Sequence, residues 1–213
     1  IWLVGARGNV ATTTLVGLTA LQQGHTVPVG LVSELPQFAS LQLPAWNDFV
    51  VGGHEIRRTP LVETAEDLAR QNRARDGVVV AVRRDLLRSG GNIRPGTLVN
   101  AGPAIEELAD GRWRRRQETP AAAVKRVQRD MRAFVRKQKL RQLVVVHVAS
   151  TEPAIDAAVV PRKWAELQAL LEHPRKCPLG ASSLYAVAAL DAGYPFINFT
   201  PSLGSNLDAI REL

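Results

Sequence analysis

Five short runs of apolar residues along the chain predict strands. Each run ends at Gly, Pro or polar residues, and each is too short for a buried helix. The predicted strands span residues 1–4, 27–32, 49–51, 143–149 and 196–199. The first run has no polar position, which is typical of a strand that is buried on both faces of a parallel sheet.

Segments with apolar residues at helical spacing alternate with these runs. The predicted helices span residues 12–23, 60–75, 120–135, 161–172 and 182–192. Thr-Pro pairs at 59–60 and 119–120 supply an N-cap and a proline at the first helical position. Gly24 and Gly193 stand where a helix ends, and we interpret Ser182-Ser183 as an N-cap.

The alternation of strands and helices indicates the fold class. Short apolar strands separated by helices favour an α/β fold, Rossmann-like and doubly wound, with a mostly parallel sheet and helices on both faces. Residues 33–46 contain two prolines and predict a long loop. No topology follows for residues 78–117, and the whole chain, 1–213, reads as one domain.

Composition narrows the class of protein. The chain has 213 residues, 46% of them hydrophobic, which excludes a disordered or collagen-like protein. Its single cysteine, Cys177, cannot form an internal disulfide. No apolar run has the length of a membrane span. We therefore expect a cytoplasmic protein with no membrane partner.

The net charge of +7 comes from one segment. Residues 112–142 hold twelve Lys or Arg against Glu118 and Asp130, with Trp113 as the one aromatic among the charges near the start. A solvated helix face or a subunit contact explains such a run, and a nucleic-acid-binding module is the alternative. Without a recognition motif, we do not expect a nucleic-acid partner.

The loop after the first strand carries the clearest candidate chemistry. It reads Gly5-Ala6-Arg7-Gly8-Asn9-Val10-Ala11-Thr12-Thr13 and joins a strand to a helix. A helix N-terminus offers N–H groups and a positive dipole end to a pyrophosphate, and small residues let it approach. The spacing is G-x-x-G-x-x-A rather than G-x-G-x-x-G, so a tight turn without a ligand remains open.

Polar residues after the later strands are further candidates. Glu34 would bind the ribose hydroxyls if the 27–32 run is the second strand, although an exposed loop glutamate is the commoner explanation. His54 and Glu55 follow Gly52-Gly53, and we interpret them as a ligand-facing edge. The segments 149–152 and 198–200 follow strands at the edge where open α/β sheets bind ligands.

The histidines predict no metal site. His25, His147 and His173 are dispersed, and neither an H-E-x-x-H motif nor a cysteine pair accompanies them. His147 lies within the predicted strand 143–149, and we interpret it as a histidine that is packed in the sheet or lies at its edge.

Four segments in order resemble the NAD-binding half of the myo-inositol-1-phosphate synthase family, also called inositol-3-phosphate synthase. They are residues 5–13, 47–56 (Asn-Asp-Phe-Val-Val-Gly-Gly-His-Glu-Ile), 149–152 (Ala-Ser-Thr-Glu) and 194–201 (Tyr-Pro-Phe-Ile-Asn-Phe-Thr-Pro). The match extends along nearly the whole chain. The family has Trp-Asp where this chain has His54-Glu55, Asn at Ser150, and Gly-Ser at Phe199-Thr200.

The resemblance implies a set of cofactor-binding residues and favours Glu55 over Glu34 for the adenosine ribose. The implied NAD-binding residues are Gly5, Arg7, Gly8, Asn9, Val10, Glu55, Ala149, Ser150, Thr151, Asn198 and Thr200. Arg7 leaves NADP open as an alternative to NAD, because a guanidinium could also bind a 2′-phosphate.

The resemblance also implies an activity: conversion of D-glucose 6-phosphate to myo-inositol phosphate by a homotetramer that recycles its NAD. An NAD-dependent sugar-phosphate or polyol dehydrogenase is the alternative. The family's catalytic lysines lie beyond the segment that matches 194–201. We therefore expect the catalytic residues outside this chain, and no turnover by residues 1–213 alone.

Overall fold

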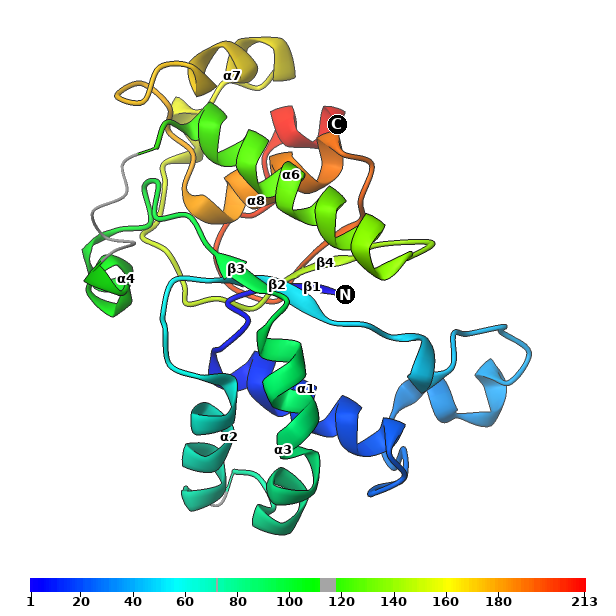
Figure 1. Ribbon diagram of the computed structural model, residues 1–213. Coiled ribbons are helices and arrows are strands. Elements are labelled where there is room, and N and C mark those ends of the chain that lie inside the picture. Colours follow the sequence, from blue (N-terminus) through cyan, green and yellow to red (C-terminus); the bar gives the residue numbers. More distant parts are fainter. Residues whose placement is uncertain (72, 112–117) are drawn as a thin grey trace. The chain divides into compact units, whose positions relative to one another are not determined.

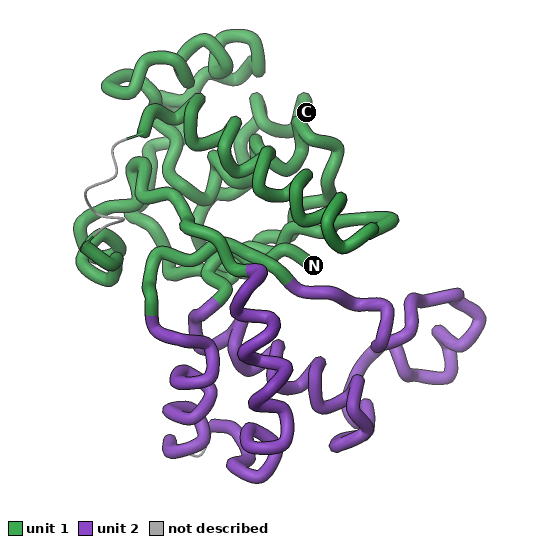
Figure 2. The backbone as a smooth tube through the Cα atoms, in the orientation of Figure 1, with its two compact units in different colours: residues 1–6, 52–58, 93–213 green, residues 7–51, 59–92 purple. Residues whose placement is uncertain are grey.

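The computed structural model describes residues 1–71, 73–111 and 118–213, which form two compact units. Unit 1 comprises Ile1–Ala6, Gly52–Arg58 and Ile93–Leu213, and unit 2 comprises Arg7–Val51 and Thr59–Asn92 (Figure 2). Among the described helices, none is long and apolar enough to cross a membrane.

Unit 1 is built on a parallel sheet of five strands. They are β1 (Trp2–Val4), β2 (Gly52–Glu55), β3 (Ile93–Pro95), β4 (Val145–His147) and β5 (Phe196–Asn198), in the order β3-β2-β1-β4-β5. In register, Trp2 pairs with Gly52 on one side and with Val145 on the other. The sequence order of the strands reverses beside β1, as at the switch point of a Rossmann sheet. The predicted α/β, Rossmann-like fold class is confirmed.

Two long helices of unit 1 lie together on one side of this sheet (Figure 1). They are α6 (Pro120–Gln138) and α8 (Ala181–Asp191), and the shorter elements are α4 (Pro103–Leu108), α7 (Trp164–Leu171), η4 (Ala157–Val159) and η5 (Asp208–Glu212). Thr119 caps α6, as its hydroxyl accepts the Ala122 N–H at 3.2 Å. Nine consecutive residues of α8, from Ala181 on, are buried.

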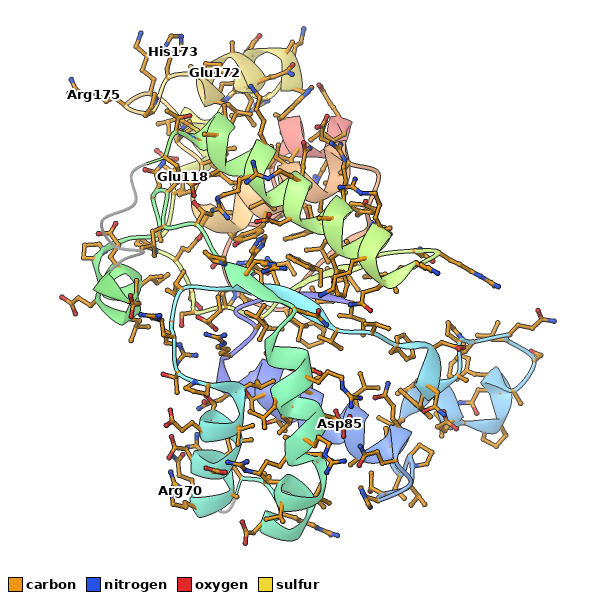
Figure 3. The ribbon with its side chains drawn as sticks, in the orientation of Figure 1. Arg70, Asp85, Glu118, Glu172, His173 and Arg175 are labelled. Carbon is orange, nitrogen blue, oxygen red and sulfur yellow. The ribbon has the colours of Figure 1, made fainter. Side chains whose placement is uncertain are left out.

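Unit 2 is helical. Its elements are α1 (Asn9–Gln22), α2 (Leu61–Arg70) and α3 (Asp76–Gly90), with three short 3-10 turns, η1 (Val32–Glu34), η2 (Pro36–Phe38) and η3 (Trp46–Asp48). The three helices pack against one another. Gln22 anchors the end of the long loop by donating to the carbonyls of Trp46 and Phe49. Asp85 on α3 accepts from Gln23 and Arg88 (Figure 3).

The second and third predicted strands are wrong. Residues 27–31 form no regular element, and Val27 and Val29 are 69% and 82% exposed, so this apolar run has no core to join. The strand predicted at 49–51 lies instead at Gly52–Glu55. Its glycines are needed inside the sheet, because a Cβ on Gly52 would lie 2.8 Å from Phe134 and one on Gly53 would collide with the Leu3 carbonyl.

Several helix boundaries also differ from prediction. The helix predicted at 60–75 is α2, which ends already at Arg70. Residues 78–117, for which the sequence predicts no topology, contain most of α3 together with β3 and α4. Pro60 is the N-cap of α2, so Thr59 lies outside the helix. Ser182 is inside α8, whose N-cap is Gly180, so the predicted serine cap is wrong.

The basic segment, residues 112–142, is partly buried in the fold. Arg126 is only 6% exposed and forms a bidentate pair with Glu118, at 2.9 and 2.7 Å, while it also donates to the carbonyls of Pro95 and Gly96. The exposed cations of this segment include Arg129, Arg132, Arg136, Lys137, Lys139 and Arg141. Residues 112–117, with Trp113 and Arg114–Arg116, lie outside the described part of the chain.

A buried polar cluster ties β1 and β2 to α6. The indole N–H of Trp2 donates to His54 Nδ1 at 3.1 Å, so the proton of the neutral ring is on Nε2, which faces Asp130 Oδ2 at 3.3 Å. Burial lowers the pKa of His54, and the Asp130 hydrogen bond opposes that shift. The predicted ligand-facing role of His54 is therefore wrong, since the ring is 0% exposed and has both nitrogens engaged.

His147 on β4 makes the stability of the fold pH-dependent. Burial lowers its pKa from 6.5 to about 4. As the pH falls below about 6.5, the unfolded chain takes up a proton that the folded one does not. The contribution of His147 to the free energy of unfolding then declines until about pH 4, by up to about 3 kcal/mol.

Chemical denaturation of wild type and His147→Gln between pH 4 and 8 tests this expectation. The difference in free energy of unfolding between the two proteins should be constant above about pH 6.5, and below that pH it should shift in favour of the variant. The exposed His25→Gln variant is the control and should follow wild type throughout. A constant difference for His147→Gln across the whole range would contradict the prediction.

Candidate functional site

The turn after β1 brings the glycine loop against the segment after β4. Gly5 has a φ of +85°, and the N–H groups of Gly5 and Ala6 both donate to the His54 carbonyl at 3.0 Å. A Cβ on Gly5 would lie 2.7 Å from the Cα of Ala149. Only glycine meets both requirements, so two of the predicted site residues, Gly5 and Ala149, are in direct contact.

The N-terminus of α1, in unit 2, is open to an anion. Its N-cap, Gly8, provides no side-chain hydrogen bond, and its first turn contains no acidic residue. Asn9 and Val10 are exposed and Arg7 is half-buried. The Thr12 hydroxyl is buried and has no hydrogen-bond partner among the described residues. Uncapped N–H groups, the positive end of the helix dipole and an unsatisfied hydroxyl fit a phosphate or pyrophosphate here.

Glu55 occupies the carboxyl end of β2. Its side chain is 4% exposed, its Oε1 accepts from the N–H groups of Ile56 (2.9 Å) and Arg57 (3.2 Å), and the Arg57 guanidinium lies 3.6 Å away. These contacts fix the direction of the carboxylate. In a Rossmann sheet, the acid that binds the ribose hydroxyls follows the second strand, and Glu55 has that place.

Glu34 does not have that place. It lies in η1, is exposed, and follows no strand. The rule that an acid follows the second strand therefore selects Glu55 once the strand is located correctly.

Polar groups follow β4 and β5 at the same edge of the sheet. After β4, Ser150 and Thr151 are exposed. After β5, Asn198 Oδ1 accepts from the backbone N–H and the hydroxyl of Thr200, at 3.1 and 2.8 Å, and this folds the loop into a compact turn. The Thr200 hydroxyl also lies 3.4 Å from His147 Nδ1. Parallel strands end at one edge, so these loops of unit 1 share a side of the sheet.

The N-terminus of α8, in contrast to that of α1, is closed by a carboxylate. Glu152 Oε1 accepts the Ser182 N–H at 2.7 Å, and Oε2 accepts the Ser182 hydroxyl at 2.5 Å. Burial raises the pKa of Glu152, and the hydrogen bonds from Ser182 oppose that shift. A phosphate would have to displace this carboxylate, so of these two helices only α1 offers an open end.

The sequence pointed to Thr12 only as part of the loop 5–13, and it gave no signal for Ser202. Thr12 is one of three consecutive threonines, and nothing in the sequence marks which hydroxyl is buried. Ser202 follows the last recognised motif, yet its hydroxyl accepts the Glu152 N–H at 3.0 Å. Across the described residues, no group of His, Cys, Asp and Glu could hold a metal ion, and none was predicted.

Comparison with known protein families gives a match over the whole chain. The sequence profile of an NAD-binding domain, described as myo-inositol-1-phosphate synthase, matches residues 1–213. The inositol-3-phosphate synthase 1 of Bacteroides thetaiotaomicron is 26% identical over 225 residues, which cover all of this chain and 50% of that protein. The inositol-3-phosphate synthase of Saccharomyces cerevisiae is 23% identical over 241 residues, which cover 94% and 43%. The chain thus spans about half the length of these relatives.

Solved structures agree on the fold. An inositol-3-phosphate synthase from Caenorhabditis elegans superposes with a TM-score of 0.82 at 17% identity, over 99% of this chain and 45% of that one. A myo-inositol-1-phosphate synthase-related protein from Thermotoga maritima has a TM-score of 0.63 at 25% identity, over 99% and 50%. At 17% identity, the likeness to the Caenorhabditis elegans protein concerns the fold alone.

The Gly5 turn generates a stability prediction. Gly5→Ala forces a Cβ into Ala149 at a left-handed backbone position, and we expect the free energy of unfolding to fall by about 2 to 4 kcal/mol. Gly193→Ala is a matched control, because Gly193 has a φ of +77° but nothing within 4 Å of its Cβ position. Urea denaturation should show the larger loss for Gly5→Ala, and equal losses would refute the close approach.

Proposed function

The chain belongs to the myo-inositol-1-phosphate synthase family, and we propose that its protein converts D-glucose 6-phosphate to 1D-myo-inositol 3-phosphate. The match of the NAD-binding family profile to all 213 residues carries this proposal. The open N-terminus of α1 and the position of Glu55 support it, because a dinucleotide needs both a pyrophosphate site and a ribose acceptor.

NAD is the cofactor of this domain. When bound, it would supply reversible hydride transfer: oxidation at C5 of the sugar, which enolisation and C1–C6 aldol closure require, and reduction of the product ketone. The reaction is an isomerisation with no net change of cofactor. The task of this chain is then to hold and orient a cofactor that does not leave between the two hydride transfers.

We assign the binding work to three groups of residues. The N–H groups of Gly8, Asn9 and Val10, with Arg7 nearby in sequence, bind the pyrophosphate at the start of α1. Glu55 accepts hydrogen bonds from the adenosine ribose. The residues at the carboxyl ends of β1, β4 and β5 border the nicotinamide half: Gly5, Ala149, Ser150, Thr151, Asn198 and Thr200.

The remaining machinery belongs, in this proposal, to another part of the protein. Residues 1–213 act as one cofactor domain, and the groups that bind the sugar phosphate and move its protons lie outside it. The relatives named above are about twice as long as this chain, which leaves room for them. We also propose a cytoplasmic homotetramer as the working form.

Activity measurement tests the proposal directly. The complete protein, incubated with glucose 6-phosphate and NAD+, should form inositol phosphate with no net NADH, whereas isolated residues 1–213 should bind NAD+ without turnover. Phosphorus NMR follows the product and absorbance at the NADH band follows the cofactor. Steady accumulation of NADH would instead identify a sugar-phosphate or polyol dehydrogenase, and product formation by residues 1–213 alone would place the chemistry in this domain.

The ribose assignment has its own test. Glu55→Ala should weaken NAD+ binding by about 1 to 3 kcal/mol, the range for a hydrogen bond to a charged group. Glu34→Ala is the control, because Glu34 is exposed and follows no strand, and its affinity should match wild type. Isothermal titration of both variants decides between the two glutamates, and a larger loss for Glu34→Ala would overturn the assignment.

A further inference from the structure

Three segments at the carboxyl edge of the unit 1 sheet are joined through a single residue. Glu152, in the loop after β4, contacts the first turn of α8 through its carboxylate and the loop after β5 through its backbone N–H. Ser182 and Ser202 are the partners, and both are buried. Two of the joined segments, the loops after β4 and β5, border the nicotinamide half of the cofactor in the proposed function.

The carboxylate of Glu152 is engaged at the start of α8. Oε1 and Oε2 both accept from Ser182, and a Cβ on Gly180 would lie 2.7 Å from Oε2, so the helix start is shaped around this group. The Ser182 hydroxyl in turn accepts the Gly204 N–H at 3.4 Å. Glu152 therefore lies in the motif 149–152 without presenting its charge to a ligand.

The same contacts restrain Ser150 and Thr151. These two exposed residues lie between β4, which is held in the sheet, and Glu152, which is held at α8 and at Ser202. A short segment fixed at both ends retains few conformations, so its N–H and hydroxyl groups are preorganised for a ligand. If the contacts of Glu152 were removed, the loop would be free to move, and ligand binding would have to offset the entropy lost when the loop becomes ordered.

We propose that Glu152 is a positioning residue: without touching the cofactor, it fixes Ser150 and Thr151 in the conformation that binds the nicotinamide half of NAD. This inference rests on the proposed function, which assigns the 149–151 loop to that half. It differs from an assignment of Glu152 as a direct ligand, and it predicts a selective defect. Binding of the adenosine half, which uses α1 and β2, does not depend on this anchor.

The test compares NAD+ with AMP, which carries only the adenosine half, by isothermal titration of the purified protein. Glu152→Ala should raise the Kd for NAD+ about tenfold or more and leave that for AMP within about twofold. Glu152→Gln should bind both nearly as wild type, because its amide can still accept the Ser182 N–H and pair with the Ser182 hydroxyl. The matched control is Asp156→Ala, since the exposed Asp156 carboxylate caps only η4 through the Ala158 N–H.

Ser202→Ala provides a second route if Glu152→Ala does not fold. It removes only the hydrogen bond to the Glu152 N–H, and it should weaken NAD+ binding about threefold with no change for AMP. An equal loss for both probes would reduce Glu152 to a general structural role, and unchanged NAD+ affinity would remove the role altogether. Failure of the wild-type protein to bind NAD+ is a distinct result, because it would overturn the proposed function itself.

Discussion

The approach of Gly5 to Ala149 is the constraint on which the arrangement of the sheet edge depends. β1 is the central strand and is paired on both sides, so the chain must turn out of the sheet within a residue or two of its end. The left-handed backbone at Gly5 makes that turn, and the absence of a side chain lets the loop after β4 close over it. Glycine is thus required here by the fold, whether or not a cofactor is bound.

The sequence predicted the elements that follow local rules. The sequence locates β1, β4, α6 and α8 because their apolar runs or helical spacing agree with their burial. It also locates β5, although Ile197 is exposed. The run at 27–32 obeys the same rule and fails, since Pro28 and the left-handed Gly30 interrupt it and its valines face solvent. The sequence predicts β2 three residues too early, because a Gly-Gly pair favours a turn. The fold shows why glycines stand there: the neighbouring Leu3 and Phe134 leave no space for a larger residue.

The candidate site was predictable to the extent that its residues lie directly after strands. Gly5 follows β1, Ala149 lies in the loop after β4, and Glu55 and Asn198 end β2 and β5, while their roles in cofactor binding stay predictions. The contacts of Trp2 with His54, of Arg126 with the Gly96 carbonyl and of Glu152 with Ser182 were not predictable, because they join residues at least 30 positions apart. His54 is an example: the sequence predicts an exposed ligand-facing residue, but the ring is buried between Trp2 and the half-buried Asp130.

The N-termini of α1 in unit 2 and of α8 in unit 1 differ in how their positive dipole ends are satisfied. Glu152 neutralises that of α8, whereas α1 has neither a side-chain cap nor an acidic first turn. In unit 1, this pairing leaves α8 without an open anion site and makes Glu152 an anchor for the loop after β4. In unit 2, the uncapped start of α1 keeps its N–H groups for the pyrophosphate that we propose there.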